Sequence, residues 1–236
     1  MSDLISTTTV AIPTRRAFLA GLGASGVAVS LAGCAGGLGG YGLTDAIQRL
    51  LFLSSDRAFA RMLSGGGFWD DQVASLGLGG FLGTRGDILS RILTSALFKD
   101  RLQDAFGEVA YRGAERAAPL VRDTVRVIGV QNAVDLVRGG PTAATSFLRQ
   151  EMGMSLVEAM VPELGTAMRV AGDPLVGQLL GALTGSEVGN VANRVATNID
   201  ETIWREIGVE EADIRRNPRA TNDPLLIGVF GADAAF

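Results

Sequence analysis

Apolar residues recur every three or four positions along almost the whole chain after residue 43, and this spacing most constrains the fold. It places the apolar side chains on one face of an α-helix, whereas a half-buried strand would require strict alternation. The longest uninterrupted run follows Ser186 and consists of Val188, Val191, Val195, Ile199 and Ile203. The pattern predicts an all-α fold, a single-domain multi-helix bundle.

Capping residues, prolines and glycines divide this pattern into separate helices. Residues 124–128 alternate branched and polar side chains as a strand would, but the segment is short and lacks a hairpin partner, so we expect helix there too. Residues 73–83 are rich in glycine and are expected to form a loop. The expected helices begin at Thr44, Asp87, Asp100 and Pro119, cover residues 131–138, 141–152 and 155–171, begin again at Asp173 and Ser186, and finish as short helices at 210–216 and 224–230.

The first 33 residues have the layout of an export signal. A polar leader ends at Arg15 and Arg16, and an uncharged stretch over residues 17–33 closes on small residues. This order is typical of a signal peptide, and the paired arginines followed by Phe18 and Leu19 resemble the twin-arginine type. The alternative is a membrane-spanning helix. At ~1.5 Å per residue, however, the uncharged stretch reaches only roughly 25 Å, short of a ~30 Å hydrocarbon core.

The signal ends in Leu31-Ala32-Gly33-Cys34, which resembles a bacterial lipobox. In a lipobox the cysteine is acylated, with palmitate for example, and becomes the first residue of the mature protein. Cys34 is the only cysteine and has no intramolecular disulfide partner. The alternative is a chance cysteine in a run of small residues. We expect a cleaved signal peptide at 1–33, a lipidated glycine-rich tether at 34–42 and a helical domain at 43–236.

The residue types present exclude several kinds of chemistry. The chain contains no histidine, so Ser-His-Asp, Cys-His and histidine-ligated zinc sites are excluded. The only lysine, Lys99, lies in a polar segment where we expect it to be solvated. Glu210 and Asp213 share one helical face, but they lack the spaced oxygen ligands of a calcium loop. We predict no catalytic residue, no metal site and no cofactor.

The net charge of the chain limits which classes of partner we expect. The formal net charge is −4, and the chain without Asp3, Arg15 and Arg16 of the signal has 19 basic and 24 acidic side chains. A mildly acidic surface argues against nucleic acid as a partner and against long-range attraction to anionic lipid headgroups. We predict no nucleic-acid binding.

Three segments of the chain are similar to an uncharacterised proteobacterial envelope family, the domain of unknown function 4197. Residues 112–119 read Arg-Gly-Ala-Glu-Arg-Ala-Ala-Pro, residues 139–149 contain Ala-Ala-Thr-Ser-Phe-Leu-Arg, and residues 210–218 read Glu-Glu-Ala-Asp-Ile-Arg-Arg-Asn-Pro. The resemblance runs from about Leu43 to Gly231. It implies an all-helical exported protein and supplies no activity.

The polar residues that match the family form the candidate site. One hypothesis is that Arg149 and Arg215 clamp an anionic ligand while Glu115 or Glu210 orients it, since a guanidinium suits carboxylate or phosphate. The other is that the arginines and glutamates pair across helices and set the register of the bundle, which we favour. The matching residues are Glu115, Thr145, Arg149, Glu210, Glu211 and Arg215.

These features predict an exported, periplasm-facing lipoprotein that works as a non-enzymatic binding or structural envelope protein. Its expected partners are the membrane, through Cys34, and an envelope protein or apolar ligand, with the apolar residues of the 73–83 loop as a possible contact. The alternative is a carboxylate-dependent hydrolase of cell-wall glycan or a phosphoester, which for a glycosidase needs two acidic groups ~5–10 Å apart. Ala35 is not the aspartate that retains lipoproteins at the inner membrane, which favours the outer membrane.

Overall fold

A computed structural model describes residues 40–64, 67–75, 96–169 and 185–231. The export signal with Arg15 and Arg16, the anchor at Cys34, the helices expected from Asp87 and Asp173, and most of the 73–83 loop lie outside these residues. All regular structure within the described residues is helical, without a strand among them, which confirms the all-α prediction. None of the helices described there combines the length and the apolar character needed to cross a bilayer.

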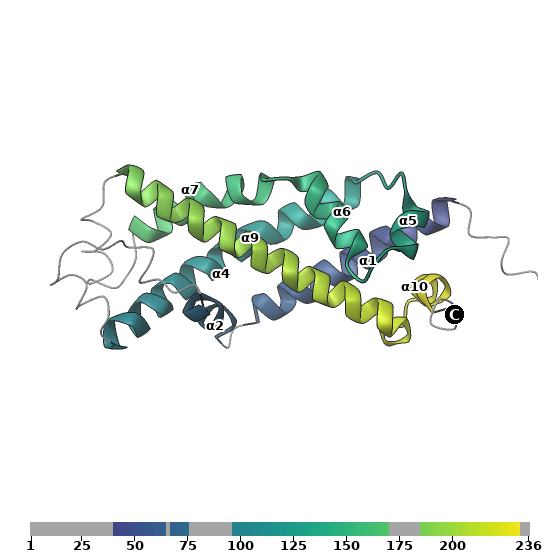
Figure 1. The fold of residues 1–236 in the computed structure, drawn as a ribbon, viewed down its shortest axis with the longest axis horizontal. Helices are drawn as coiled ribbons and strands as arrows, with labels where there is room; N and C mark the ends of the chain where they lie inside the picture. Colours follow the sequence, from purple (N-terminus) through teal and green to yellow (C-terminus); the bar gives the residue numbers. More distant parts are fainter. Residues whose placement is uncertain (1–39, 65–66, 76–95, 170–184, 232–236) are drawn as a thin grey trace, which may run out of the picture. The chain divides into compact units, whose positions relative to one another are not determined.

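The helices are labelled as in Figure 1. In chain order they are α1 (Gly40–Met62), α2 (Phe68–Ser75), α4 (Ala96–Val127), α5 (Ala133–Arg138), α6 (Ala143–Met152), α7 (Ser155–Arg169), α9 (Gly185–Arg216), the 3-10 helix η2 (Pro218–Thr221) and α10 (Pro224–Phe230).

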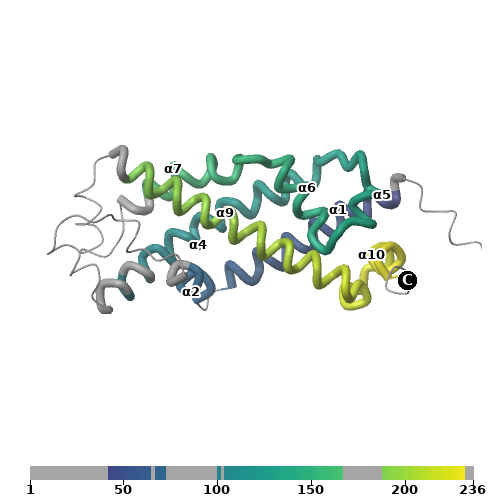
Figure 2. The backbone as a smooth tube through the Cα atoms, in the orientation of Figure 1, coloured from purple at the N-terminus to yellow at the C-terminus, as the bar shows by residue number. Residues whose placement is uncertain are grey.

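Helix α9 is central to the packing, because α1, α4 and α7 all contact it, α1 and α7 most extensively. Helix α2 lies on α4, while the short helices α5 and α6 pack against α1 and α9 (Figures 1 and 2). The apolar run predicted from Val188 to Ile203 is buried, and Ile207 and Ile214 continue the same buried face to the end of α9. One hydrophobic core therefore includes residues from all these helices.

Small residues on α4 let the long helices approach closely. Ala110, Ala114 and Ala117 are fully or almost fully buried. Between them lies Gly113, where an added Cβ would stand 2.9 Å from the Cδ1 atom of Ile199 on α9. Contacts between real Cβ atoms and neighbouring carbons are longer than this, so the close packing of α4 on α9 depends on this glycine.

Several predicted helix boundaries were wrong. Thr44 and Asp100 were expected to begin helices, but α1 begins at Gly40 and α4 at Ala96, so both residues lie inside a helix. Pro119 was expected to begin a helix, but it lies inside α4, which continues unbroken from Ala96 to Val127. Pro119 is exposed, whereas Ala117 and Val121 are buried in the core on either side of it, so tertiary packing keeps the two halves in one helix.

A further error is at residues 210–216, which are the last turns of α9 and not a separate helix. The helix continues into this segment through Gly208. The glycine has no side chain and so makes room for Thr142, because an added Cβ would lie 3.1 Å from the Thr142 Cγ2 atom. The predicted loop at 73–83 also begins too early, because α2 extends to Ser75. The helices expected at 131–138, 141–152, 155–171 and 224–230 agree with α5, α6, α7 and α10 to within two residues at each described end.

Candidate functional site

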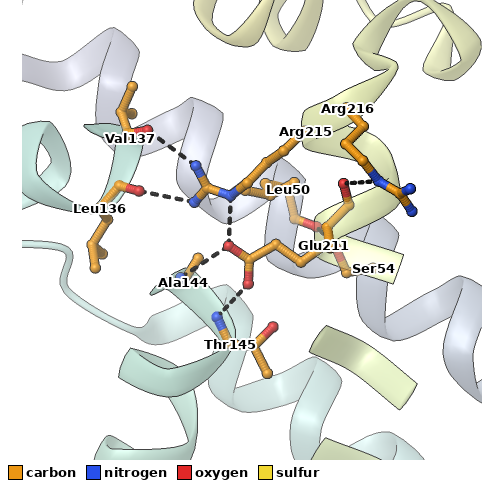
Figure 3. A network of polar contacts seen from close by, with 10 residues as sticks. Leu50, Ser54, Leu136, Val137, Ala144, Thr145, Glu211, Arg215 and Arg216 are labelled. Carbon is orange, nitrogen blue, oxygen red and sulfur yellow. Dashed lines mark hydrogen bonds and ion pairs between the residues drawn. The ribbon is translucent and has the colours of Figure 1, made fainter. Parts of the chain in front are cut away.

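The first residue of the site is Glu211, which is completely buried near the end of α9. Its carboxylate accepts hydrogen bonds from the backbone N–H of Ala144 at 3.0 Å and of Thr145 at 2.6 Å, both in the first turn of α6 (Figure 3). First-turn N–H groups have no partner within their own helix and lie at its positive end. The residue before α6, Thr142, makes no side-chain capping bond, so Glu211 caps this helix from another element.

Arg215, one turn further along α9, caps the C-terminal end of a different helix, α5. Its Nε donates to Glu211 at 2.8 Å, and its two terminal nitrogens donate to the carbonyls of Leu136 at 2.8 Å and Val137 at 3.0 Å in α5 (Figure 3). The last carbonyls of a helix are unpaired and carry its negative end. The guanidinium also stands 4.8 Å from the centre of the Phe230 ring in α10.

We call these contacts the Glu211–Arg215 network. The carboxylate and the guanidinium pair with each other and face helix ends of opposite sign, which offsets the cost of burying side chains that are 0% and 11% exposed. The network joins α9 to α5, α6 and α10. Thr145 contributes its backbone N–H, while its buried hydroxyl has no hydrogen-bond partner among the described residues.

Arg149 occupies a different part of α6 and binds another carboxylate. Its guanidinium donates to Asp200 on α9 at 3.3 Å, and the other oxygen of Asp200 accepts from the indole N–H of Trp204 at 2.8 Å. Burial raises the pKa of the Asp200 carboxyl, although the Trp204 hydrogen bond and the charge of Arg149 act in the opposite direction.

The structure therefore places Arg149 and Arg215 on separate acidic partners. Asp200 and Glu211 are eleven residues apart on one helix, which corresponds to roughly 16 Å along its axis. A small anion held by both arginines would have to displace these two carboxylates.

The remaining candidates lie apart from the network. Glu210 binds Arg61 of α1 at 2.8 Å, and the same guanidinium binds Glu206 at 2.8 Å. Glu115 is exposed on α4. Of the six candidates, the structure brings together Thr145, Glu211 and Arg215.

Sequence reasoning missed a cavity of about 70 Å³ between α2, α4 and α9. Its walls come from three helices distant in the sequence, so no local motif marks it. Glu201 is the one carboxylate among its described lining residues, whereas the hydrolase alternative requires two. Within the described part of the chain, no group of three or more acidic, cysteine or histidine side chains is arranged to hold a metal ion.

Comparisons with known proteins agree with the resemblance found in the sequence. A family model described as "Protein of unknown function (DUF4197)" matches residues 39–231, which include every helix described above. No curated protein and no solved structure matches the chain.

Proposed function

Since the chain belongs to this family of unknown function, DUF4197, which assigns no activity, we propose that it is an exported lipoprotein whose helical domain binds or scaffolds other molecules without catalysing a reaction. The domain faces the periplasm, and Cys34 carries the acyl chains that hold it at the membrane. Position 35 is alanine and not the aspartate that retains lipoproteins at the inner membrane, which favours the outer membrane.

The observation that carries the non-enzymatic role is the use made of Glu211 and Arg215. Glu211 is fully buried and the Arg215 side chain is 11% exposed, and the hydrogen-bonding groups of both are directed at the ends of α5 and α6. A catalytic or ligand-binding charge must be reachable by the substrate, whereas these two stabilise the junction of four helices. The pairing supports a domain that acts as a preformed scaffold for a partner protein or an apolar ligand.

The sequence signals for export and lipidation support the proposed location at the membrane, facing the periplasm. Arg15 and Arg16 precede an uncharged stretch, and the single cysteine follows three small or apolar residues. Two or more acyl chains on Cys34 would give stable attachment, because each buried methylene group contributes ~0.8 kcal/mol. The membrane is thus the first partner, and nucleic acid is not expected to be one.

Metabolic labelling with radioactive palmitate tests this proposal. We expect label in the wild-type chain and none in Cys34→Ser, and we expect the double change Arg15→Lys, Arg16→Lys to leave unprocessed precursor in the cytoplasm. Asp3→Asn lies in the polar leader outside the arginine pair and serves as the matched control, with unchanged labelling and export. Label that persists in Cys34→Ser, or an intact mass that still begins at Met1, would refute the anchor.

A further inference from the structure

The cavity between α2, α4 and α9 has an apolar floor. It is formed by the rings of Trp69 and Phe106 and by the aliphatic side chains of Ala110, Val195 and Ile199. All five are at least nine-tenths buried. Apolar walls of this kind stabilise a hydrocarbon group that leaves water.

The rim of the cavity is polar but close to neutral. Arg205 donates from α9 to the side-chain oxygen of Gln72 on α2 at 2.7 Å and lies 3.4 Å from the Thr202 hydroxyl. Glu201 on the same rim carries the opposite charge to Arg205, and Asn198 adds an amide. Such a rim offers both donors and acceptors to a bound molecule, and its opposite charges give no preference for a charged ligand.

One buried donor at the cavity has no hydrogen-bond partner in the described part of the chain. Trp69 is 5% exposed, and its indole N–H makes no hydrogen bond among the described residues. The second tryptophan, Trp204, is equally buried, but its indole N–H donates to Asp200 at 2.8 Å. Unpaired buried donors are uncommon in folded proteins and often mark the place of a bound water or ligand.

From these observations we propose that the cavity binds a small neutral molecule with a short apolar chain and a carbonyl or amide group. The chain would occupy the floor, and the oxygen would accept a hydrogen bond from Trp69 after a small adjustment of that ring. The volume of about 70 Å³ is roughly half of the ~150 Å³ that encloses the six carbons of benzene, so the floor fits a chain of about three carbons. This inference rests on the proposed binding role of the domain, but not on its membrane anchor.

The test uses the full chain labelled with ¹⁵N in the tryptophan indoles, which gives one NMR signal for each of its two tryptophans. Titration with butyramide should shift the Trp69 signal to saturation and leave the Trp204 signal in place. Acetamide, which lacks two methylene groups, should bind roughly tenfold more weakly. The proposal fails if the Trp69 signal does not shift saturably, if both signals shift equally, if acetamide binds as well, or if butyrate binds more tightly than butyramide.

Two variants locate the binding. Ala110→Leu fills the floor and should abolish the shift, whereas Ala60→Leu at an exposed position of α1 should not. An unchanged Trp204 signal reports that each variant is folded.

A third variant tests the hydrogen bond. Trp69→Phe keeps a ring but removes the donor, and should weaken butyramide binding about tenfold by ligand-detected NMR. Unchanged binding in Trp69→Phe would overturn the assigned hydrogen bond.

Failure of the cavity and failure of the anchor are distinguishable. A chain that takes up palmitate but gives no butyramide shift keeps the anchor and loses the cavity. A chain that binds butyramide but is never labelled keeps the cavity and loses the anchor.

Discussion

Two aspartates illustrate how position decides the behaviour of a charge at the scale of single residues. Burial raises the pKa of Asp200, and its hydrogen bond from Trp204 and the charge of Arg149 only partly offset this. Burial acts in the same direction on Asp223, but the hydrogen bond from Arg49 and those from the first backbone N–H groups of α10 outweigh it, so its pKa is lowered. The two carboxyls therefore affect stability in opposite directions as pH changes.

Asp200→Asn tests the first of these. Because the folded-state pKa of Asp200 lies above the ordinary value of 3.8, its contribution to stability falls as pH rises above 3.8. Asparagine lacks this titration, so the variant should gain stability relative to wild type between about pH 3 and neutral pH. At neutral pH the difference should stay within about 1 kcal/mol, because Arg149 is half exposed and the lost ion pair contributes little. Urea unfolding across this pH range measures the trend.

Asp223→Asn is the matched control with the opposite sign. Its lowered pKa means that its contribution is present above 3.8 and is lost as pH falls below that value. Asparagine can still cap α10, so the variant should lose stability relative to wild type as pH rises towards 3.8, and the deficit should stay constant at higher pH. Parallel trends in the two variants would contradict both assignments.

Glu211→Gln tests the buried network. The substitution keeps the size of the side chain but leaves Arg215 without its carboxylate, and breaking a buried pair in this way should lower the free energy of unfolding by about 3 kcal/mol. Glu108→Gln is the control, since Glu108 and Arg112 form a pair in which both side chains are about 60% exposed. We expect the control to lose no more than about 0.5 kcal/mol by thermal or urea unfolding. Equal effects would show that burial does not decide the strength of the pair.

The residues of this network were found from the sequence, but their partners were not. Glu211 and Arg215 stood out because they match a family segment. Their partners are backbone groups of Ala144, Thr145, Leu136 and Val137, which every non-proline residue offers in equal measure. Only the position of the helix ends in space makes these groups available, and that position depends on the whole bundle.

At the scale of helices, the apolar period predicted which segments are helical but not where neighbouring helices join. Pro119 was interpreted as a helix start because proline is favoured there, yet it lies within α4. Burial of Ala117 and Val121 on either side outweighs the lost backbone hydrogen bond. In contrast, α10 was predicted with its observed bounds because its start signal is local: Asp223 accepts from the N–H of both Leu225 and Leu226.

Glycines within the long helices test how closely the helices pack. Gly113→Ala gains helix propensity, but the new Cβ would lie 2.9 Å from Ile199 and must displace it. We expect a net loss of about 1 kcal/mol in the free energy of unfolding. Ile199→Val removes the Cδ1 atom in question, so the double variant should lose less than the sum of the two single changes.

Gly189→Ala is the control for this pair. Gly189 also lies in a long helix, but it is exposed and an added Cβ would meet nothing within 4 Å. This change should stabilise the protein by about 0.5–1 kcal/mol through helix propensity alone. If Gly113→Ala were also stabilising, α4 and α9 would not be in the close contact described above.

At the scale of the whole molecule, α9 unites the separate interactions. Its middle buries Ile203 in the core, its polar residues form the cavity rim, and its last turns hold α5, α6 and α10 through Glu211 and Arg215. Helices α5 and α6 depend on α9 for the capping of their ends, so they are not expected to persist when it unfolds. The charges and the apolar face of α9 thus contribute to one cooperative unit.

The described core is one cluster whose members all lie between Ala46 and Phe230, and residues 38–236 form one compact unit. We therefore expect the chain without residues 1–37 to unfold in a single transition, with a Tm within about 2 °C of that of the longer chain. Ile203→Ala creates a cavity at the centre of α9 and should lower stability by about 2–5 kcal/mol while keeping the transition single. Calorimetry checks the single transition, which requires equal calorimetric and van't Hoff enthalpies. NMR provides a second check: the indole signals of Trp69 in α2 and Trp204 in α9 should disappear at the same temperature. Separate loss of the Trp69 signal would mean that α2 and the cavity wall unfold independently, and the bundle would then consist of two units and not one.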